Sequence, residues 1–570
     1  MTGLDKKRIV ICEYISTGIN YIDDVWARGY EPVLLEGHYV GKDEEVAPFL
    51  KARAAINERF KDRVRIIPEN PDYNEILKQV KELDPILVIA GSEFGVPLAT
   101  RLSEDLGLPG NPLSALRSMT EKDAMHEALK KAGIRYMRGE VIKSEEEAES
   151  FYRSLGTEDV VVKRVRGAGT QGVYLCHGLE EMRKAVRESL GSGIKNERED
   201  EDVSILLQER IIGKEYIVNT VSCNGEHYVC SVWESNKVKM PNGTNAYNNM
   251  MTVPRFSVGH SALIRYACNV ASAIGIKYGP VHGEYMVDDK GPVLIEVNCR
   301  PMGAGLQREY LEEVFGHHET DIALDSYLDP VKFKNEMNKP YRLNKFAAIK
   351  LFILKDDTEV YTAPIMQIAR HLRSYYKADF NGIGRDLILS ETKNMETVGG
   401  TVYLIDKDEN LVREECELLH LLEMKYPGIL YQGEGDEDSG LNIRPDLDEV
   451  IRSGNCHGAT LIFSDSIKEY KGATVVDGNT LNDAYDSFEQ GVLDISETGS
   501  FADLESVIQQ IFKFTEKIRP GGRILVPEST YVHLPYGMEG AEILLKAAGL
   551  RIEMPSGAIK SLLIASKERI

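Results

Sequence analysis

The segment 282–301, HGEYMVDDKGPVLIEVNCRP, contains two carboxylates, Glu284 and Glu296, whose spacing would let them act together in a chemical site. The segment predicts two short strands joined by a three-residue loop over 289–291 that ends in glycine. This loop length places Glu284 directly opposite Glu296, and like charges that face each other across a strand pair are destabilising. A hard cation between them would remove the repulsion, because Mg²⁺ takes oxygen ligands, usually one or two carboxylates together with substrate phosphates.

The predicted hairpin has one apolar face and one polar face. Its loop pairs Asp288 with Pro292, and alternation along the strands then separates the side chains. The apolar face holds Tyr285, Val287, Val293, Ile295 and Val297, and the polar face holds His282, Glu284, Glu296, Asn298 and Arg300, interrupted by Met286 and Leu294. An ordinary hairpin with a solvated polar face would show the same pattern, so both interpretations stay open on this segment alone.

A glycine-rich loop lies upstream, in DVVVKRVRGAGTQGVYL (159–175). Lys163 ends an apolar strand, and the loop 166–172 that follows has little steric bulk. Backbone N–H groups in such a loop can approach phosphate oxygens closely. A flexible surface hairpin is the structural alternative for this segment.

Two glutamates flank a short apolar stretch in LQERIIGKEYIVN (207–219). A nucleotide site needs an acceptor for the amino group of the base and another for the ribose hydroxyls. Glu209 could serve the base and Glu215 the ribose. Solvent-exposed glutamates on a strand pair are the alternative.

The whole chain has the composition of a soluble globular protein of several domains. It has 570 residues, 42% of them hydrophobic and 28% charged, and a net charge of −22. This acidic balance argues against a nucleic-acid partner, which would require a basic surface. We find no run of about 18 apolar residues and no signal peptide, so we expect no membrane partner. Eight scattered cysteines without a C-x-x-C pair favour a reducing, cytoplasmic location.

The elements that must position these motifs form an α/β protein. Apolar runs at residues 8–12, 32–35, 63–67 and 86–90, with helical stretches between them, predict a Rossmann-like parallel sheet. No G-x-G-x-x-G follows the first run, so we assign no nucleotide site there. We expect domains at 1–112, 113–432 and 433–570, the last after the linker YQGEGDEDSG (431–440). Within the second, α+β domain we expect a mobile lid subdomain at about 135–208 and a C-terminal subdomain at about 335–432.

The order of these motifs resembles that of the ATP-grasp superfamily over roughly residues 1–430. A helix with Glu121-Lys122-Asp123 comes first, and then the strand-ending lysine, the glycine-rich loop, the glutamate pair and the hairpin with Glu-x-Asn-x-Arg. The chain looks most like the branch that contains L-amino acid ligases and bacilysin-synthetase-type dipeptide ligases. It departs from the family at Arg164, where proline often follows the lysine.

The resemblance implies roles for individual residues. Lys122 and Lys163 would contact nucleotide phosphates, Gly169, Thr170 and Gln171 would lie in the lid loop, Glu209 and Ile212 would hold adenine, and Glu215 would hold ribose. Glu284 and Glu296 would hold Mg²⁺, or Mn²⁺, with help from Asn298. Asn298 and Arg300 would be catalytic, with Arg300 facing the acyl-phosphate oxygens. His282 would support this site, and Trp233, Lys237, Asn242 and Tyr247 are candidate substrate contacts.

The implied activity is an ATP-dependent, ADP-forming ligation of a small carboxylate to an amine. Amino acids are the expected substrates, a dipeptide or amino-acid amide the expected product, and a homodimer the expected assembly. A biotin-carboxylase-like or nucleotide-pathway ligase is an alternative, although the chain has no Ala/Val-Met-Lys-Met biotinyl site. An alternative of another class is a non-catalytic ATP-binding scaffold, against which the intact set of predicted catalytic residues argues.

The C-terminal region has a separate resemblance. Residues 472–570, with RPGGRILV (519–526), resemble the later half of a class I methyltransferase, in which a Pro-Gly-Gly turn precedes a strand. The glycine-rich acidic motif of such a domain is missing. We therefore favour a degenerate, structural or dimerising module over the alternative, a working domain that binds S-adenosylmethionine.

Overall fold

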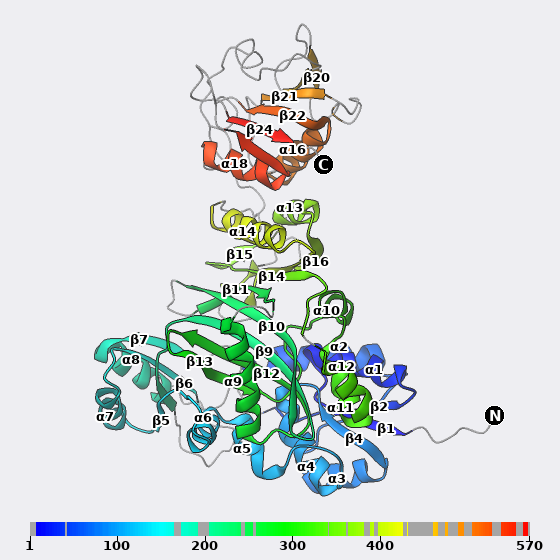
Figure 1. Cartoon of the computed structure of the whole chain (residues 1–570), viewed down its shortest axis with the longest axis vertical. Helices are drawn as coiled ribbons and strands as arrows, with labels where there is room; N and C mark the ends of the chain where they lie inside the picture. Colours follow the sequence, from blue (N-terminus) through cyan, green and yellow to red (C-terminus); the bar gives the residue numbers. More distant parts are fainter. Residues whose placement is uncertain are drawn as a thin grey trace, which may run out of the picture. The chain divides into compact units, whose positions relative to one another are not determined.

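The computed structural model divides the chain into two units, Met1–Phe346 and, except for the short segment 393–396, the remainder (Figure 1). It describes residues 7–39, 43–164, 173–191, 205–240, 245–254, 258–339, 341–360, 363–380, 388–392, 397–425, 430, 460–464, 473–476, 481, 488–494, 504–526, 537–553 and 563–567. Helices and strands occur in both units, which confirms the predicted α/β class. Among the helices within these ranges, none combines the length and apolarity that crossing a bilayer requires.

A four-stranded parallel sheet opens the first unit. Its strands are β1 (Arg8–Cys12), β2 (Glu31–Leu35), β3 (Arg65–Ile67) and β4 (Pro85–Ala90), in the order β3-β2-β1-β4. The helices between them are α1 (Asn20–Ala27), α2 (Asp43–Phe60) and α3 (Tyr73–Lys81), and α4 (Val96–Asp105) follows β4. The apolar runs therefore form the predicted strands, although β3 is shorter than its run.

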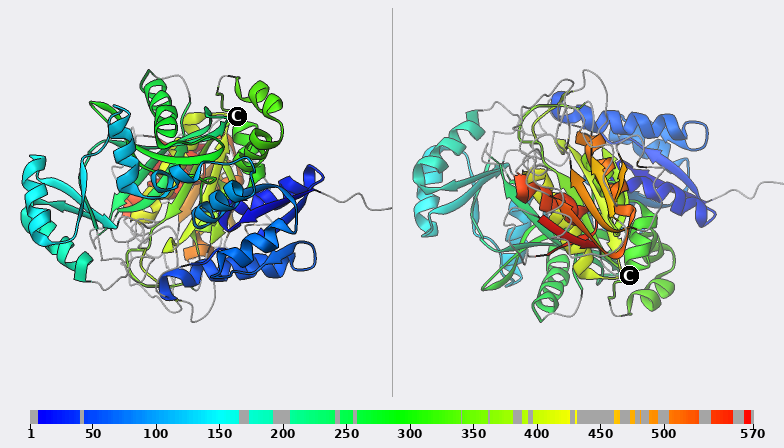
Figure 2. Two further views of the ribbon diagram at one scale, coloured as in Figure 1. Left: turned by 90° about the horizontal axis from the view of Figure 1, so that it is seen from below. Right: turned by 90° about the horizontal axis from the view of Figure 1, so that it is seen from above.

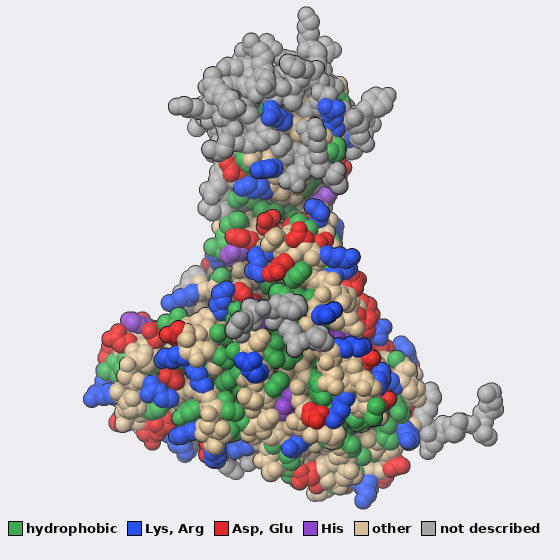
Figure 3. Space-filling view, viewed as in Figure 1, with side chains coloured by type: hydrophobic (Ala, Val, Ile, Leu, Met, Phe, Trp, Pro, Cys, Tyr) green, Lys and Arg blue, Asp and Glu red, His purple; other side chains and the backbone are tan. Residues whose placement is uncertain are grey.

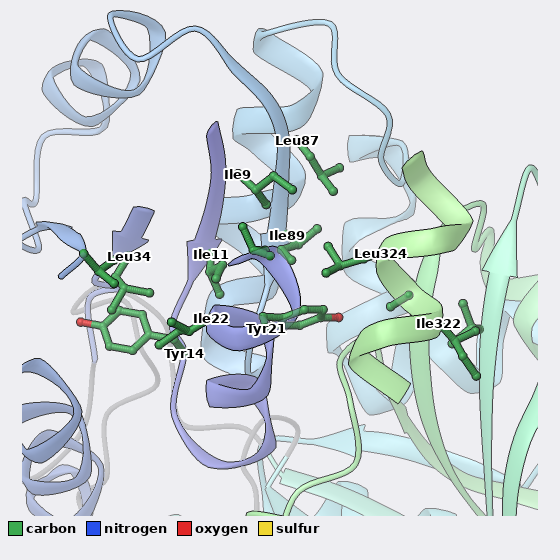
Figure 4. Close-up of a cluster of buried hydrophobic side chains, with 14 of the residues drawn as sticks. Ile9, Ile11, Tyr14, Tyr21, Ile22, Leu34, Leu87, Ile89, Ile322 and Leu324 are labelled. Carbon is green, nitrogen blue, oxygen red and sulfur yellow. The ribbon is translucent and has the colours of Figure 1, made fainter. Parts of the chain in front are cut away.

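The parallel sheet is buried on both faces, as parallel sheets usually are. One face packs with Val10, Val33 and Val88. The other face packs with Ile9 and Ile11, and this cluster includes Ile322 and Leu324 of α11 (Glu319–Leu328). Figure 4 shows Leu324 on the side of α11 that faces Ile89 of β4, whereas Ile322 lies on the other side of the helix. The N-terminal sheet is therefore joined by a shared apolar core to the part of the chain that follows the hairpin.

A second, antiparallel sheet with helices on it lies in the range predicted for a lid subdomain. Its strands, in the order β5-β8-β6-β7, are β5 (Gly139–Ile142), β8 (Ile205–Glu209), β6 (Asp159–Arg164) and β7 (Tyr174–His177). Helices α7 (Glu145–Leu155) and α8 (Gly178–Gly191) cover its apolar core. Figure 2 shows this part in cyan on the side away from the blue N-terminal sheet.

The central antiparallel sheet of the first unit carries most of the predicted site residues. Its strands, in the order β13-β12-β9-β10-β11, are β9 (Lys214–Cys223), β10 (Glu226–Lys239), β11 (Asn245–Thr252), β12 (Gly279–Asp288) and β13 (Gly291–Asn298). Helices α5 (Leu116–Thr120), α6 (Lys122–Lys131) and α9 (Val258–Ile274) pack against it. Helices α10 (Arg308–Phe315), α11 and α12 (Pro330–Met337) follow.

The hairpin β12–β13 confirms one prediction and corrects another. Glu284 does lie directly opposite Glu296, but Asp288 pairs with Gly291 rather than with Pro292. The connection is a two-residue turn, which Gly291 permits because its φ is +104°. A bulge at Ile295 then restores the pairing of the two carboxylates, and it buries Leu294, which we had placed on the polar face.

The second unit begins at Ala347, within β14 (Phe346–Phe352), and continues with β16 (Tyr375–Phe380) and β18 (Gly400–Asp406), in the order β14-β18-β16. Helices α13 (Ile365–His371) and α14 (Glu409–Lys425) accompany them, and β15 (Thr358–Glu359) pairs with β17 (Ile388–Leu389). Lys350 is completely buried and pairs with Glu423 of α14 at 2.6 Å.

The last sheet of the second unit has the order β20-β19-β21-β22-β24-β23. Its strands are β19 (Thr460–Ser464), β20 (Ala473–Val476), β21 (Phe488–Asp494), β22 (Ile518–Val526), β23 (Leu550–Glu553) and β24 (Leu563–Lys567), with helices α16 (Leu504–Glu516) and α18 (Gly537–Ala547). The first four strands in this order are parallel, and β24 is antiparallel to both of its neighbours. The Pro-Gly-Gly sequence does not precede a strand as predicted. It lies inside β22, where the register with β21 shifts between Ile518 and Arg523.

Candidate active site

The two hairpin carboxylates lie within a network of cations and donors. Glu296 Oε2 is 2.7 Å from Lys122 Nζ, at the start of α6, and Asn298 Nδ2 donates to Glu296 Oε1 at 3.4 Å. Glu284 Oε1 accepts a hydrogen bond from Tyr247 Oη at 3.4 Å. The bulge at Ile295 keeps both carboxylates on one face, so the sheet presents a pair of oxygen ligands there.

Both carboxyl groups are held in the ionised form. Burial alone would raise their pKa values, but cations reverse its effect. For Glu284, the hydrogen bond from His282 and the charge of Lys237 lower the pKa to about 2. For Glu296, Lys122 is the main cause of a lowered pKa. The donor set is thus two ionised carboxylates, which fits a hard divalent cation.

Lys163, at the end of β6, is a second buried cation near the pair. Its side chain is 6% exposed. Burial, and then the neighbouring charge of Lys122, lower its pKa to about 8. Two close lysines are mutually repulsive, so an anion such as a phosphate placed between them would be stabilised.

The two glutamates assigned to the nucleotide are placed differently. Glu215, on β9, is buried and lies 2.7 Å from Lys237 Nζ. Glu209, at the end of β8, accepts from the backbone N–H of Arg138 at 2.7 Å and pairs with its guanidinium at 3.3 Å. Ile212 is 69% exposed, as expected of a side chain available to cover a planar ligand.

Gly213 follows this exposed isoleucine at a point of close backbone approach. A Cβ at this position would lie 2.2 Å from the carbonyl oxygen of Val287. The segment between β8 and β9 therefore requires glycine, which lets β9 begin directly beside β12.

Arg300 has a partner that sequence reasoning missed. Its Nη2 lies 2.9 Å from Glu93 Oε2, which follows β4 of the N-terminal sheet. The only signal in the sequence was the position of Glu93 just after the predicted strand at 86–90. Side chains beyond the carboxyl ends of parallel strands often form ligand sites. The pair brings the N-terminal domain to the edge of the hairpin site.

A buried polar network, also missed, lies behind Glu284. His282 Nδ1 contacts Asn219 Oδ1 at 2.8 Å, and its Nε2 lies 3.5 Å from Glu284 Oε1. Asn219 Nδ2 donates to Ser231 Oγ at 2.7 Å, and Glu319 accepts the backbone N–H of Met302 at 2.8 Å. His282 is thus placed to orient Glu284, which agrees with its predicted supporting position.

The structure brings most of the predicted site residues together around the hairpin. Around the hairpin lie Lys122, Lys163, Glu215, Lys237, Tyr247, Glu284, Glu296, Asn298 and Arg300. Trp233 was wrong as a substrate candidate. It is completely buried, packs on Phe315 with ring centroids 5.5 Å apart and donates to Ser231. Gly169, Thr170, Gln171 and Asn242 lie outside the described residues.

Comparisons with known proteins agree with the order of the motifs. Residues 157–308 match the family described as ATP-grasp domain. Dapdiamide A synthase from Enterobacter agglomerans is 28% identical over 278 residues, which cover 49% of this chain and 65% of that protein. The carbamoyl phosphate synthase large chain of Thermotoga maritima is 22% identical over 322 residues, which cover 52% of this chain and 27% of that protein.

Solved structures show the same fold. An L-amino acid ligase from Bacillus licheniformis aligns with a TM-score of 0.56 at 17% identity, covering 74% of this chain and 98% of that one. An N5-carboxyaminoimidazole synthase from Aspergillus clavatus aligns with a TM-score of 0.53 at 12% identity, covering 74% and 100%. The chain spans less than two thirds of dapdiamide A synthase and about a quarter of the carbamoyl phosphate synthase large chain. This chain contains an ATP-grasp domain, as its motif order predicted.

Proposed function

We propose that the protein is an ATP-dependent, ADP-forming carboxylate–amine ligase. The observation that carries the proposal is the ionised pair Glu284 and Glu296, flanked by Lys122 and Arg300 on an ATP-grasp domain. Among similar proteins, an Aspergillus clavatus carboxyaminoimidazole ribonucleotide synthase is complexed with ATP, and a biotin carboxylase domain is in complex with MgADP. Their ligands support ATP and Mg²⁺ as the ligands of this site.

The residues present fit this chemistry by charge and by type. Glu284 and Glu296, with Asn298, would hold Mg²⁺, which when bound neutralises phosphate charge and orients the transferred group. Lys122 and Lys163 would hold the phosphates of ATP, and Glu209 and Glu215 would hold its base and ribose. The chain needs no covalent nucleophile of its own, because positioning and neutralisation of charge are the main demands of phosphoryl transfer.

The ligation would proceed in two steps. A substrate carboxylate attacks the γ-phosphorus of ATP, which forms an acyl phosphate and releases ADP. Arg300, held by Glu93, would face the oxygens of this intermediate. An amine then attacks the acyl carbon, phosphate leaves, and the amine loses a proton. The lid subdomain would exclude water, because acyl phosphates hydrolyse readily.

Amino acids are the proposed substrates, and a dipeptide or amino-acid amide is the proposed product. The similarity to dapdiamide A synthase and to an L-amino acid ligase supports both. We also propose a homodimer in a reducing cytoplasm, in keeping with seven free cysteines among the described residues. The region 433–570 would serve as a structural or dimerising module.

Analysis of nucleotide products tests the proposal. The purified chain would be incubated with ATP, Mg²⁺ and pools of amino acids, and the products ADP, AMP and phosphate separated by chromatography. We expect ADP and phosphate only with particular pools, and mass spectrometry should then find the coupled product. AMP and pyrophosphate would overturn the mechanism. ATP binding without turnover in any pool would favour the non-catalytic scaffold.

A further inference from the structure

Lys237 is a buried cation that helps to lower the pKa of Glu284 but has no ligand of its own in the proposed reaction. It lies on β10 with its side chain 15% exposed, and its Nζ is 2.7 Å from Glu215 Oε1. The same Nζ lies 4.2 Å from the centroid of the Tyr247 ring. Burying an ammonium group costs free energy unless the group is paired. The carboxylate of Glu215 and the ring of Tyr247 offset that cost for Lys237.

A bulge in β11 places Tyr247 opposite Lys237. Asn236 pairs with Asn249, but Lys237 pairs with Tyr247, so Asn248 is the extra residue on β11. Bulges often re-aim side chains beside active sites. Tyr247 donates in turn to Glu284. Lys237 therefore lies between the carboxylate assigned to the ribose and a carboxylate assigned to the metal.

Lys237 is the charged partner that opposes the effect of burial on Glu215. Its side chain is 10% exposed, and burial raises its pKa above the ordinary value while Lys237 opposes that shift. A carboxylate can accept hydrogen bonds from both hydroxyls of a vicinal diol, whereas a protonated carboxyl group carries a competing donor. Hydrogen bonds to a charged acceptor are also stronger than those between neutral groups.

We propose that Lys237 is a positioning residue that holds Glu215 as the acceptor of the two ribose hydroxyls, and so makes the site selective for ribonucleotides. This inference rests on the proposed function only in so far as ATP binds with its ribose at Glu215. It assigns Lys237 to the nucleotide rather than to the amine or carboxylate substrate. Lys237 acts on the nucleotide through Glu215 and contacts none of the reacting groups.

Equilibrium binding of ATP and 2′-deoxy-ATP to the full chain, with Mg²⁺ present, tests the inference. The wild-type chain should prefer ATP by roughly tenfold or more, which is the usual effect of a hydrogen bond to a charged group. Lys237→Met should weaken ATP binding and reduce this preference to about twofold or less. Lys237→Arg, which keeps the charge, should retain most of the preference. Lys239→Met is the matched control, because Lys239 is exposed two residues further along β10.

A double-variant comparison separates this role from a merely structural one. If Lys237 acts through Glu215, Lys237→Met should change ATP binding less than about twofold in a Glu215→Gln background. The double variant, Lys237→Met with Glu215→Gln, also removes both charges of the pair. No unpaired buried charge then remains to destabilise the fold. Unchanged nucleotide preference in Lys237→Met, or a loss confined to the KM of the amine or carboxylate, would overturn the inference. A wild-type chain that binds no ATP would overturn the proposed function and this inference with it.

Discussion

At the scale of single residues, Glu296 is the most demanding test of the proposed reaction. It faces Glu284, pairs with Lys122 and accepts from Asn298. We predict that Glu296→Ala lowers ADP formation by at least about 10²–10³-fold, because a ligand that neutralises transition-state charge is lost. Chromatographic ADP assays measure this. Glu309→Ala is a control at an exposed site, and full ATPase activity in Glu296→Ala would refute the metal assignment.

Lys163 gives a prediction for pH dependence. Its pKa of about 8 means that the free chain carries this charge below pH 8 and loses it as the pH rises. The affinity for ATP should therefore fall above about pH 8. Titration of ATP binding from neutral to alkaline pH measures this fall. Lys163→Arg, whose guanidinium stays charged, should bind with a flat profile, and an equal fall in both proteins would contradict the assignment.

At the scale of elements, the prediction of the hairpin was wrong in the length of its loop and in its regular pairing, but it still placed Glu284 opposite Glu296. A three-residue loop in a regular hairpin and a two-residue turn followed by a bulge both place Glu284 opposite Glu296. The alternation of residue types could not separate them, because a bulge shifts the alternation without changing the composition. The sign of the bulge in the sequence was Leu294, an apolar residue on the predicted polar face. The bulge turns this side chain into the core.

The buried pair of Lys350 and Glu423 joins β14 to α14 in the second unit. Their side chains are 0% and 4% exposed, and breaking a buried pair leaves an uncompensated charge. We predict that Lys350→Met lowers the free energy of unfolding by about 3–5 kcal/mol, measured by urea denaturation with intrinsic fluorescence. Lys350→Met combined with Glu423→Leu should lose distinctly less. A loss below about 1 kcal/mol in the single variant would mean that the pair is solvated.

At the scale of the whole first unit, the N-terminal domain completes the site from a distant part of the sequence. Arg28, which follows α1, pairs with Asp321 and Asp325 of α11, each at 2.7 Å, and the shared apolar core lies beside them. Charged side chains of both signs are interspersed over the face seen in Figure 3. Contact between the N-terminal and ATP-grasp parts thus places Glu93 beside Arg300.

The Glu93–Arg300 pair predicts a selective defect. Glu93→Gln should leave the affinity for ATP within about twofold of the wild-type value. It should raise the KM of the carboxylate substrate or of the amine substrate about tenfold, because Arg300 loses its charged partner. Steady-state kinetics with each substrate varied separately measures the two effects. Glu104→Gln, on α4, is a control in the same domain. Equal losses of ATP affinity and substrate KM would instead indicate general damage to the domain contact.

The sequence by itself determined the class of the fold, the parallel N-terminal sheet, the motif order and the pairing of the two hairpin carboxylates. These follow from local features, namely hydrophobic periodicity, turn residues and the spacing of charged groups along single strands. Only the tertiary structure decided that Trp233 is core, that Glu93 supports Arg300 and that Lys237 belongs with Glu215. Those facts depend on which strands are neighbours and on where a bulge falls, and residues far apart in sequence carry no local signal of either.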